Sequence, residues 1–69
     1  MHLNRDQFIE EHGYNIFTDT GRIDLVQLAA LYSLVEYGFD RYKCNAMIRD
    51  INKMFGTYFR EVVIYKERR

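Results

Sequence analysis

The sequence predicts a small α+β domain in which three helices, at about residues 5–12, 25–37 and 41–55, carry a short two-stranded antiparallel ribbon. The two strands are expected at about residues 14–18 and 57–65. Three observations predict this class: capping signals at helix starts, glycines at helix ends, and β-branched and aromatic residues gathered near the C-terminus. An all-α bundle is the alternative, because the last segment also fits a helix.

The chain is expected to form one domain over residues 1–69, because this length supports a single small core. Such a domain buries only about 60% of the surface that its unfolded chain exposes, so its stability margin is thin. Cys44 has no second cysteine to pair with, and together with His2 and His12 it offers too few ligands for a zinc site. We therefore expect no metal and no cofactor. The chain carries instead five phenylalanines and six tyrosines, large side chains of which several are expected to reach a partner.

The first two helices are predicted by the same N-terminal signal. At each start, a capping residue and a glutamine three positions later are expected to exchange hydrogen bonds, and apolar residues flank the pair as a hydrophobic staple. The first helix is expected to end at Gly13, because glycine followed by an apolar residue is typical of a helix C-cap. The two start motifs are Leu3-Asn4-x-x-Gln7-Phe8 and Ile23-Asp24-x-x-Gln27-Leu28.

The second predicted helix, 25–37, carries apolar side chains almost all round its surface. A helix of this kind is buried on more than one side, so we expect it to be the central element of the fold or of an oligomer. The excess apolar surface therefore also suggests that the chain forms a homodimer that buries Val26, Ala30 or Tyr37.

The third predicted helix, 41–55, is the most clearly amphipathic segment of the chain. Its apolar residues fall within an arc of roughly 120° at 100° per residue, so this side is expected to face the core. The opposite side is polar and is expected to face water or a ligand. The core arc contains Cys44, Met47, Ile48, Ile51, Met54 and Phe55, and the polar side contains Arg41, Asn45, Arg49, Asn52 and Lys53.

The last predicted element is a strand at 57–65, which we expect to pair with 14–18. The run from Val62 to Tyr65 is β-branched and aromatic, and charged pairs flank it as gatekeepers against aggregation. The pattern indicates an edge strand that avoids indiscriminate pairing and can add one chosen partner by strand addition.

Charge and hydropathy restrict the classes of partner. Lysine plus arginine and aspartate plus glutamate balance at 10 each, although residues 1–24 carry a net −3 and residues 25–69 a net +3. A neutral chain lacks the basic footprint of a nucleic-acid binder. The apolar runs are too short for a membrane span, no secretory signal is visible, and the single thiol suits a reducing compartment, so we expect a cytoplasmic protein.

The sequence contains few candidate catalytic residues. Ser33, the only serine, lies in the most apolar helix without the glycines of a nucleophile elbow, and Cys44 lies on the core side of its helix. Neither pattern is typical of a nucleophile. The sequence therefore predicts a protein that is not an enzyme.

The predicted function is binding. The sequence favours a small protein that binds a larger protein or protein complex and modulates it, most simply by inhibiting it, in the style of phage-encoded inhibitors or of an adaptor. Tyrosine and arginine dominate protein-interface hot spots, and both lie on the outer side of the third helix and along the last segment. The expected partner-binding residues are Tyr42, Asn45, Arg49, Lys53, Tyr58, Arg60 and Tyr65.

The alternative function is a small helix-turn-helix-like regulator that binds nucleic acid. The short link Tyr37-Gly38-Phe39-Asp40 joins the second and third predicted helices, and the polar side of the third carries residue types that contact phosphates and base edges. The zero net charge makes a protein partner the stronger prediction.

Overall fold

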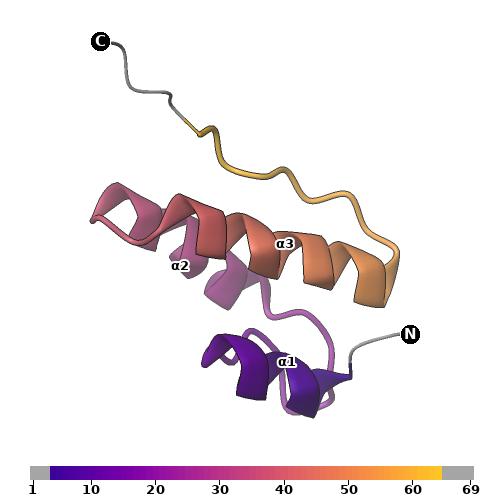
Figure 1. Cartoon of the computed structure of the whole chain (residues 1–69). Helices are drawn as coiled ribbons and strands as arrows, with labels where there is room; N and C mark the ends of the chain where they lie inside the picture. Colours follow the sequence, from indigo (N-terminus) through magenta and orange to yellow (C-terminus); the bar gives the residue numbers. More distant parts are fainter. Residues whose placement is uncertain (1–3, 65–69) are drawn as a thin grey trace, which may run out of the picture.

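The computed structural model describes residues 4–64 and consists of three helices (Figure 1). They are α1 (Arg5–His12), α2 (Leu25–Glu36) and α3 (Arg41–Phe55), within a residue of the bounds predicted from the sequence. The longest helix, α3, packs against both α1 and α2, whereas α1 and α2 make no direct helix–helix contact. The central element of the single-chain fold is therefore α3 and not the second helix; whether α2 is central to an oligomer stays a prediction.

The predicted α+β class is also wrong, since residues 4–64 contain no strand and no sheet. Residues 57–64 are extended, but they run back beside α3 and pair with no other strand (Figure 1). The 14–18 segment makes instead one isolated antiparallel bridge, Phe17 to Ile23, that closes its own turn. The class that the structure supports is the all-helical alternative, with the last segment extended rather than helical; position 65 lies outside the described residues.

The helix starts follow the predicted capping chemistry with one exception. At α1 the capping box is complete, because the Asn4 side chain accepts from the Gln7 N–H at 2.8 Å and the Gln7 side chain accepts from the Asn4 N–H at 3.0 Å. At α2 the Asp24 side chain caps the helix, but the backbone N–H of Asp24 donates to the Ile16 carbonyl at 2.9 Å. This tertiary hydrogen bond replaces the one that the Gln27 side chain was expected to accept from the Asp24 N–H.

The core lies where the three helices meet the loop between α1 and α2. The α3 side chains Cys44, Met47, Ile48 and Ile51 are buried, as the amphipathic pattern predicted, but Phe55 is 38% exposed and Asn45, placed on the polar side, is buried. Phe8 of α1 is fully buried, and its ring meets the ring of Phe17 edge-on at 5.2 Å. The remaining core residues are Ile16, Leu28, Leu31 and Val35.

The apolar surface of α2 is divided between the core and solvent. Leu28, Leu31 and Val35 face inward, but Val26 is 75% exposed and Tyr37, just after the helix, is 88% exposed. The opposite side of α2, which we call the α2 outer face, consists of exposed uncharged residues: Val26, Ala29, Ala30, Ser33, Leu34 and Tyr37. The described part of the chain leaves this face uncovered.

Candidate functional site

Two asparagines of α3 hold the C-terminal segment, residues 57–64. The Asn45 side chain donates to the Val62 carbonyl at 3.0 Å and accepts from the Val62 N–H at 2.7 Å. The Asn52 side chain makes the same two hydrogen bonds with Phe59, donating to its carbonyl at 3.0 Å and accepting from its N–H at 2.9 Å. Each side-chain amide thus satisfies the donor and the acceptor of one backbone residue. We call Asn45 and Asn52 the amide clamp.

The spacing of the clamp matches the spacing of its targets. Seven residues of α-helix separate Asn45 from Asn52, a rise of about 10.5 Å. Three residues separate Phe59 from Val62, and three residues of extended chain span about 10 Å. A regular strand repeats every two residues, so backbone groups three residues apart point to opposite edges of it. Pairing with the clamp is therefore incompatible with a regular β-ladder, which is why the predicted strand does not form.

Further contacts fix the segment along α3 and α2. The Arg41 guanidinium donates to the Val63 carbonyl at 3.1 Å, and the Tyr32 hydroxyl of α2 donates to the Arg60 carbonyl. Arg49, between the two clamp residues, pairs with Glu61 at 3.2 Å. The side chains of Phe59 and Val62 are half-buried and pack against the core. Main-chain recognition, one ion pair and two apolar anchors thus define the position of the segment.

Burial makes the clamp structurally important. Asn45 is only 5% exposed, although it is polar. A buried amide is tolerated when its hydrogen bonds are made, and within residues 4–64 every buried side-chain nitrogen and oxygen has a partner. The clamp is also uncharged, so it can hold an N–H and a C=O with the same side chain.

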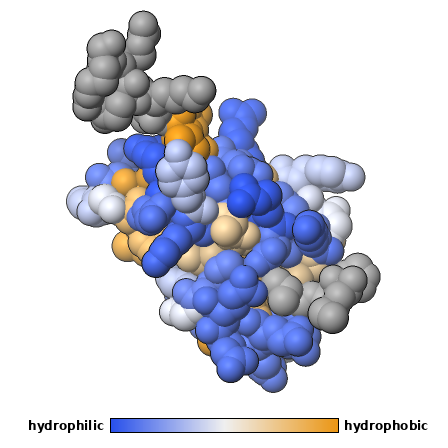
Figure 2. Space-filling view, in the orientation of Figure 1, coloured by the Kyte–Doolittle hydropathy of each residue, from blue (hydrophilic) through white to orange (hydrophobic). Residues whose placement is uncertain are grey.

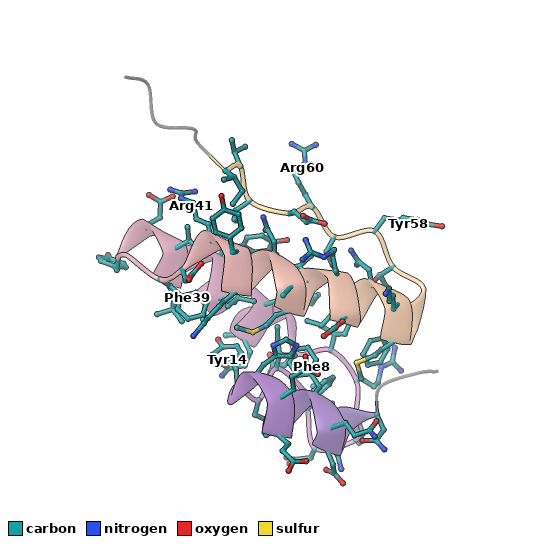
Figure 3. The ribbon with its side chains drawn as sticks, viewed as in Figure 1. Phe8, Tyr14, Phe39, Arg41, Tyr58 and Arg60 are labelled. Carbon is teal, nitrogen blue, oxygen red and sulfur yellow. The ribbon has the colours of Figure 1, made fainter. Side chains whose placement is uncertain are left out.

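The predicted partner-binding residues are distributed over two environments. Asn45 is committed to the clamp, whereas Arg49 is exposed and pairs with Glu61 of the C-terminal segment. Tyr58, which is 96% exposed, and Arg60 project away from α3 along the outer edge of the segment (Figure 3). Tyr42 and Lys53 are exposed as well, and Tyr65 lies outside the described residues.

Sequence analysis placed Asn52 on the polar side of its helix but missed its role. The available signal was the seven-residue spacing of two asparagines beside the core arc, where a repeat of two helical turns places both amides on one side. Identifying their target required knowing that the chain reverses at Gly56, whose φ of 64° is left-handed. The α3 side seen in Figure 2 is predominantly hydrophilic, with hydrophobic residues mainly at its edges.

A second polar group joins α1 to α3. Side-chain ligand atoms of Glu11, His12 and Asp50 lie within 4.8 Å of one another, and these are donor types that bind divalent metals. His12 Nε2 and Asp50 Oδ2 are already 2.7 Å apart and pair directly. The group therefore works as a tertiary link between the helices without any ion. Sequence analysis did not connect His12 with a residue 38 positions away.

An open groove of about 520 Å³ lies where the start of α2, the end of α3 and the beginning of the C-terminal segment meet. Its lining is mainly apolar and includes Arg22. Its volume falls within the range of about 300–1,000 Å³ that small-molecule pockets have, although the groove is open rather than enclosed. The lining residues are Arg22, Ile23, Leu25, Phe55, Thr57 and Phe59.

Comparison of the chain with known protein families, with characterised proteins and with solved structures finds no match. Among residues 4–64, none of the helices combines the length and the apolar character that crossing a membrane requires. The function is therefore argued from the described residues themselves.

The two residues that sequence reasoning considered as nucleophiles, Cys44 and Ser33, lack the surroundings of an activated nucleophile. Cys44 is fully buried, and burial raises the pKa of its thiol, while the nearby Arg41 has a smaller effect in the opposite direction. A buried thiol with a raised pKa is a poor nucleophile, because the thiolate is the reactive form. Ser33 is exposed on α2, and no histidine or carboxylate among residues 4–64 forms a hydrogen bond with it.

We expect the protein to lose stability at alkaline pH. Burial raises the pKa values of Tyr14, Tyr32 and Cys44, with a smaller contribution from Cys44 to the two tyrosines. The unfolded chain therefore releases these protons at lower pH than the folded chain, and the free energy of unfolding falls as pH rises above about 9. Urea midpoints measured from pH 7 to pH 10.5 should decrease, and Tyr14→Phe should flatten the decrease. A midpoint that stays level would contradict the burial of these groups.

Proposed function

We propose that the protein is a non-enzymatic binding module that docks on a protein partner through the α2 outer face and modulates the partner by covering part of its surface. The observation that supports this function is the exposure of Val26 and Tyr37, at 75% and 88%, on a side of α2 whose margin carries one charged residue, Glu36. Contiguous exposed apolar residues of this kind mark protein interaction sites.

The chemistry of this face suits a helix-packing interface. Complete burial of a side chain the size of valine or leucine contributes about 1.5–3 kcal/mol, and tyrosine is a frequent hot-spot residue. Ala29, Ala30 and Ser33 are small, so a partner helix can approach α2 closely between the larger residues. Tyr42 and Tyr58 lie on other parts of the surface and provide a separate candidate contact region.

A nucleic-acid partner has weaker support. The groups that suggested a recognition helix, above all the amides of Asn45 and Asn52, are engaged with the C-terminal segment. The net charge of zero provides no attraction for a polyanion.

The test compares two valine-to-glutamate variants. Val26→Glu places a charge on the α2 outer face, and Val63→Glu makes the same change at a residue that is also exposed, at 61%, on the C-terminal segment. Val26 follows the helix cap, where an acidic residue is favourable, so the fold should be retained.

A partner is first captured from the native host with the tagged full chain and identified by mass spectrometry. Its affinity for each variant is then measured by calorimetry with both proteins purified.

We expect Val26→Glu to weaken the complex about tenfold or more, because an apolar interface cannot solvate the carboxylate, and Val63→Glu to change the affinity less than twofold. Light scattering on the chain alone shows whether the partner is a second copy, since Val26→Glu would then reduce a doubled mass to that of the monomer. Equal affinity of Val26→Glu and the unmodified chain would exclude the α2 outer face. Loss of binding only in Tyr42→Ala/Tyr58→Ala would place the contact on the surface predicted from the sequence.

A further inference from the structure

We propose that the amide clamp also binds the C-terminal segment of a second copy, so that two chains exchange residues 57–64 reciprocally. This exchange uses α3 and the segment, and not the α2 outer face. It is therefore independent of the proposed function.

The first argument is that the contacts that hold the segment are equally available to a second copy. Asn45 and Asn52 recognise main-chain N–H and C=O groups at a three-residue spacing, and Arg49 recognises the carboxylate of Glu61. The segment of a second copy has the same backbone spacing, the same charge and the same apolar anchors. The contacts between α3 and the segment are therefore the same in the closed and the exchanged form. Exchange becomes favourable when the protein concentration approaches the effective concentration of the chain's own tethered segment.

The second argument is that the segment can leave without unfolding the helices. Its anchors, Phe59 and Val62, are only half-buried, and they pack against the buried core cluster without being part of it. Segments with few buried apolar contacts open at a lower free energy than the whole domain. No disulfide restrains the segment, since Cys44 is a free thiol.

The third argument is that an open clamp favours one class of occupant. Opening leaves Asn45, which is 5% exposed in the closed form, and Asn52 without their backbone partners. Any extended chain can restore these backbone bonds, but one that also carries apolar side chains three residues apart and an acidic residue beside the second restores the apolar and ionic contacts as well. Phe59-Arg60-Glu61-Val62 of another copy has this pattern. Reciprocal exchange is a low-cost route to a dimer because it creates no new interface.

The fourth argument concerns the hinge. The closed form needs Gly56 in the left-handed conformation, φ 64°, to turn the chain back along α3 (Figure 1). An exchanged segment runs on to another molecule, so the chain no longer has to turn back along α3 at Gly56. A Cβ at Gly56 would meet nothing within 4 Å, and Gly56→Ala therefore acts on the backbone conformation alone.

The experiment traps the exchanged pair between two different full-length chains. One chain carries Arg49→Cys and the other Glu61→Cys, with Cys44→Ala in both, and circular dichroism confirms their helical content. The two are mixed and treated with a short bismaleimide that joins neighbouring thiols. The exposed Arg49–Glu61 pair that is lost contributes little to stability. As a matched control, Glu36→Cys, at an exposed carboxylate on α2, replaces Glu61→Cys.

Exchange predicts a cross-linked 49–61 heterodimer whose yield rises with concentration and exceeds that of the 49–36 control. A yield equal to the control across micromolar to millimolar concentrations would overturn the proposal.

A second measurement does not depend on cysteine. Gly56→Ala should raise the dimer association constant, measured by light scattering, about tenfold. Gly13→Ala is the control, because Gly13 has a similar φ of 67° and a Cβ there would also meet nothing within 4 Å; it should leave the association constant unchanged. Equal association constants for both variants would also reject the exchange.

Discussion

Replacing Phe8 with alanine is expected to lower the free energy of unfolding by about 3–5 kcal/mol, the usual result for a fully buried phenylalanine. Phe8 is the only buried residue of α1 and its ring contacts those of Phe17 and His12, so it is the main apolar anchor of that helix. A domain of 69 residues has only about 3–10 kcal/mol in total. We therefore expect the variant to be largely unfolded at 37 °C, as measured by circular dichroism and urea titration.

The control for this prediction is Glu10→Ala, at an exposed position of the same helix, which should change the free energy of unfolding by less than about 0.5 kcal/mol. Phe8→Leu keeps an apolar side chain in the core and should fall between the two variants. A Phe8→Ala protein that is as stable as Glu10→Ala would show that α1 is not anchored in the core.

Replacing Asn45 with alanine is expected to cost about 3 kcal/mol and to detach the C-terminal segment. The change removes both bonds to Val62 and leaves a half-buried N–H and C=O without their partners. Asn45→Asp should be about as damaging, because a carboxylate can accept from the Val62 N–H but cannot donate to its carbonyl. Urea titration gives the loss of stability, and limited proteolysis within 57–64 reports detachment of the segment.

Lys53→Ala provides the comparison, since Lys53 is an exposed residue of the same helix and its truncation should leave both the stability and the proteolysis rate nearly unchanged. If Asn45→Ala matched Lys53→Ala in both measurements, the clamp would contribute nothing to holding the segment.

The helices could be predicted from the sequence because their signals are local. Asn4 and Asp24 cap the helices that follow them, and Gly13 and Gly56 take left-handed conformations at helix ends. These interactions involve residues within one or two turns of each other. The inward side of α3 was likewise predictable, because its periodicity is a property of one helix.

The C-terminal segment could not be predicted in this way because its partners are distant and unusual. β-Branched and aromatic residues favour extended backbone, and residues 57–64 are extended. What the composition does not specify is which groups satisfy the backbone, and here they are side-chain amides up to 17 positions away. The prediction of a strand at 57–65 is therefore wrong, because the groups that satisfy this backbone belong to a helix and not to another strand.

The place of α2 illustrates a second limit. Apolar residues all round a helix predict burial on several sides, but they do not show whether the same chain supplies the cover. The structure covers Leu31 and Val35 and leaves Val26 and Tyr37 exposed. The surplus apolar surface that suggested a central helix is the surface on which the proposed binding function rests.

The central claim is that the amides of α3 hold the C-terminal segment at two points three residues apart, and hydrogen exchange of the backbone amides measured by NMR on the full chain tests it most directly. The N–H groups of Phe59 and Val62 should be protected, since they donate to Asn52 and Asn45, whereas those of Arg60, Glu61 and Val63, which have no hydrogen-bond partner among residues 4–64, should exchange rapidly. Protection of alternate residues, as in a strand, or uniformly fast exchange from 57 to 64 would contradict the account.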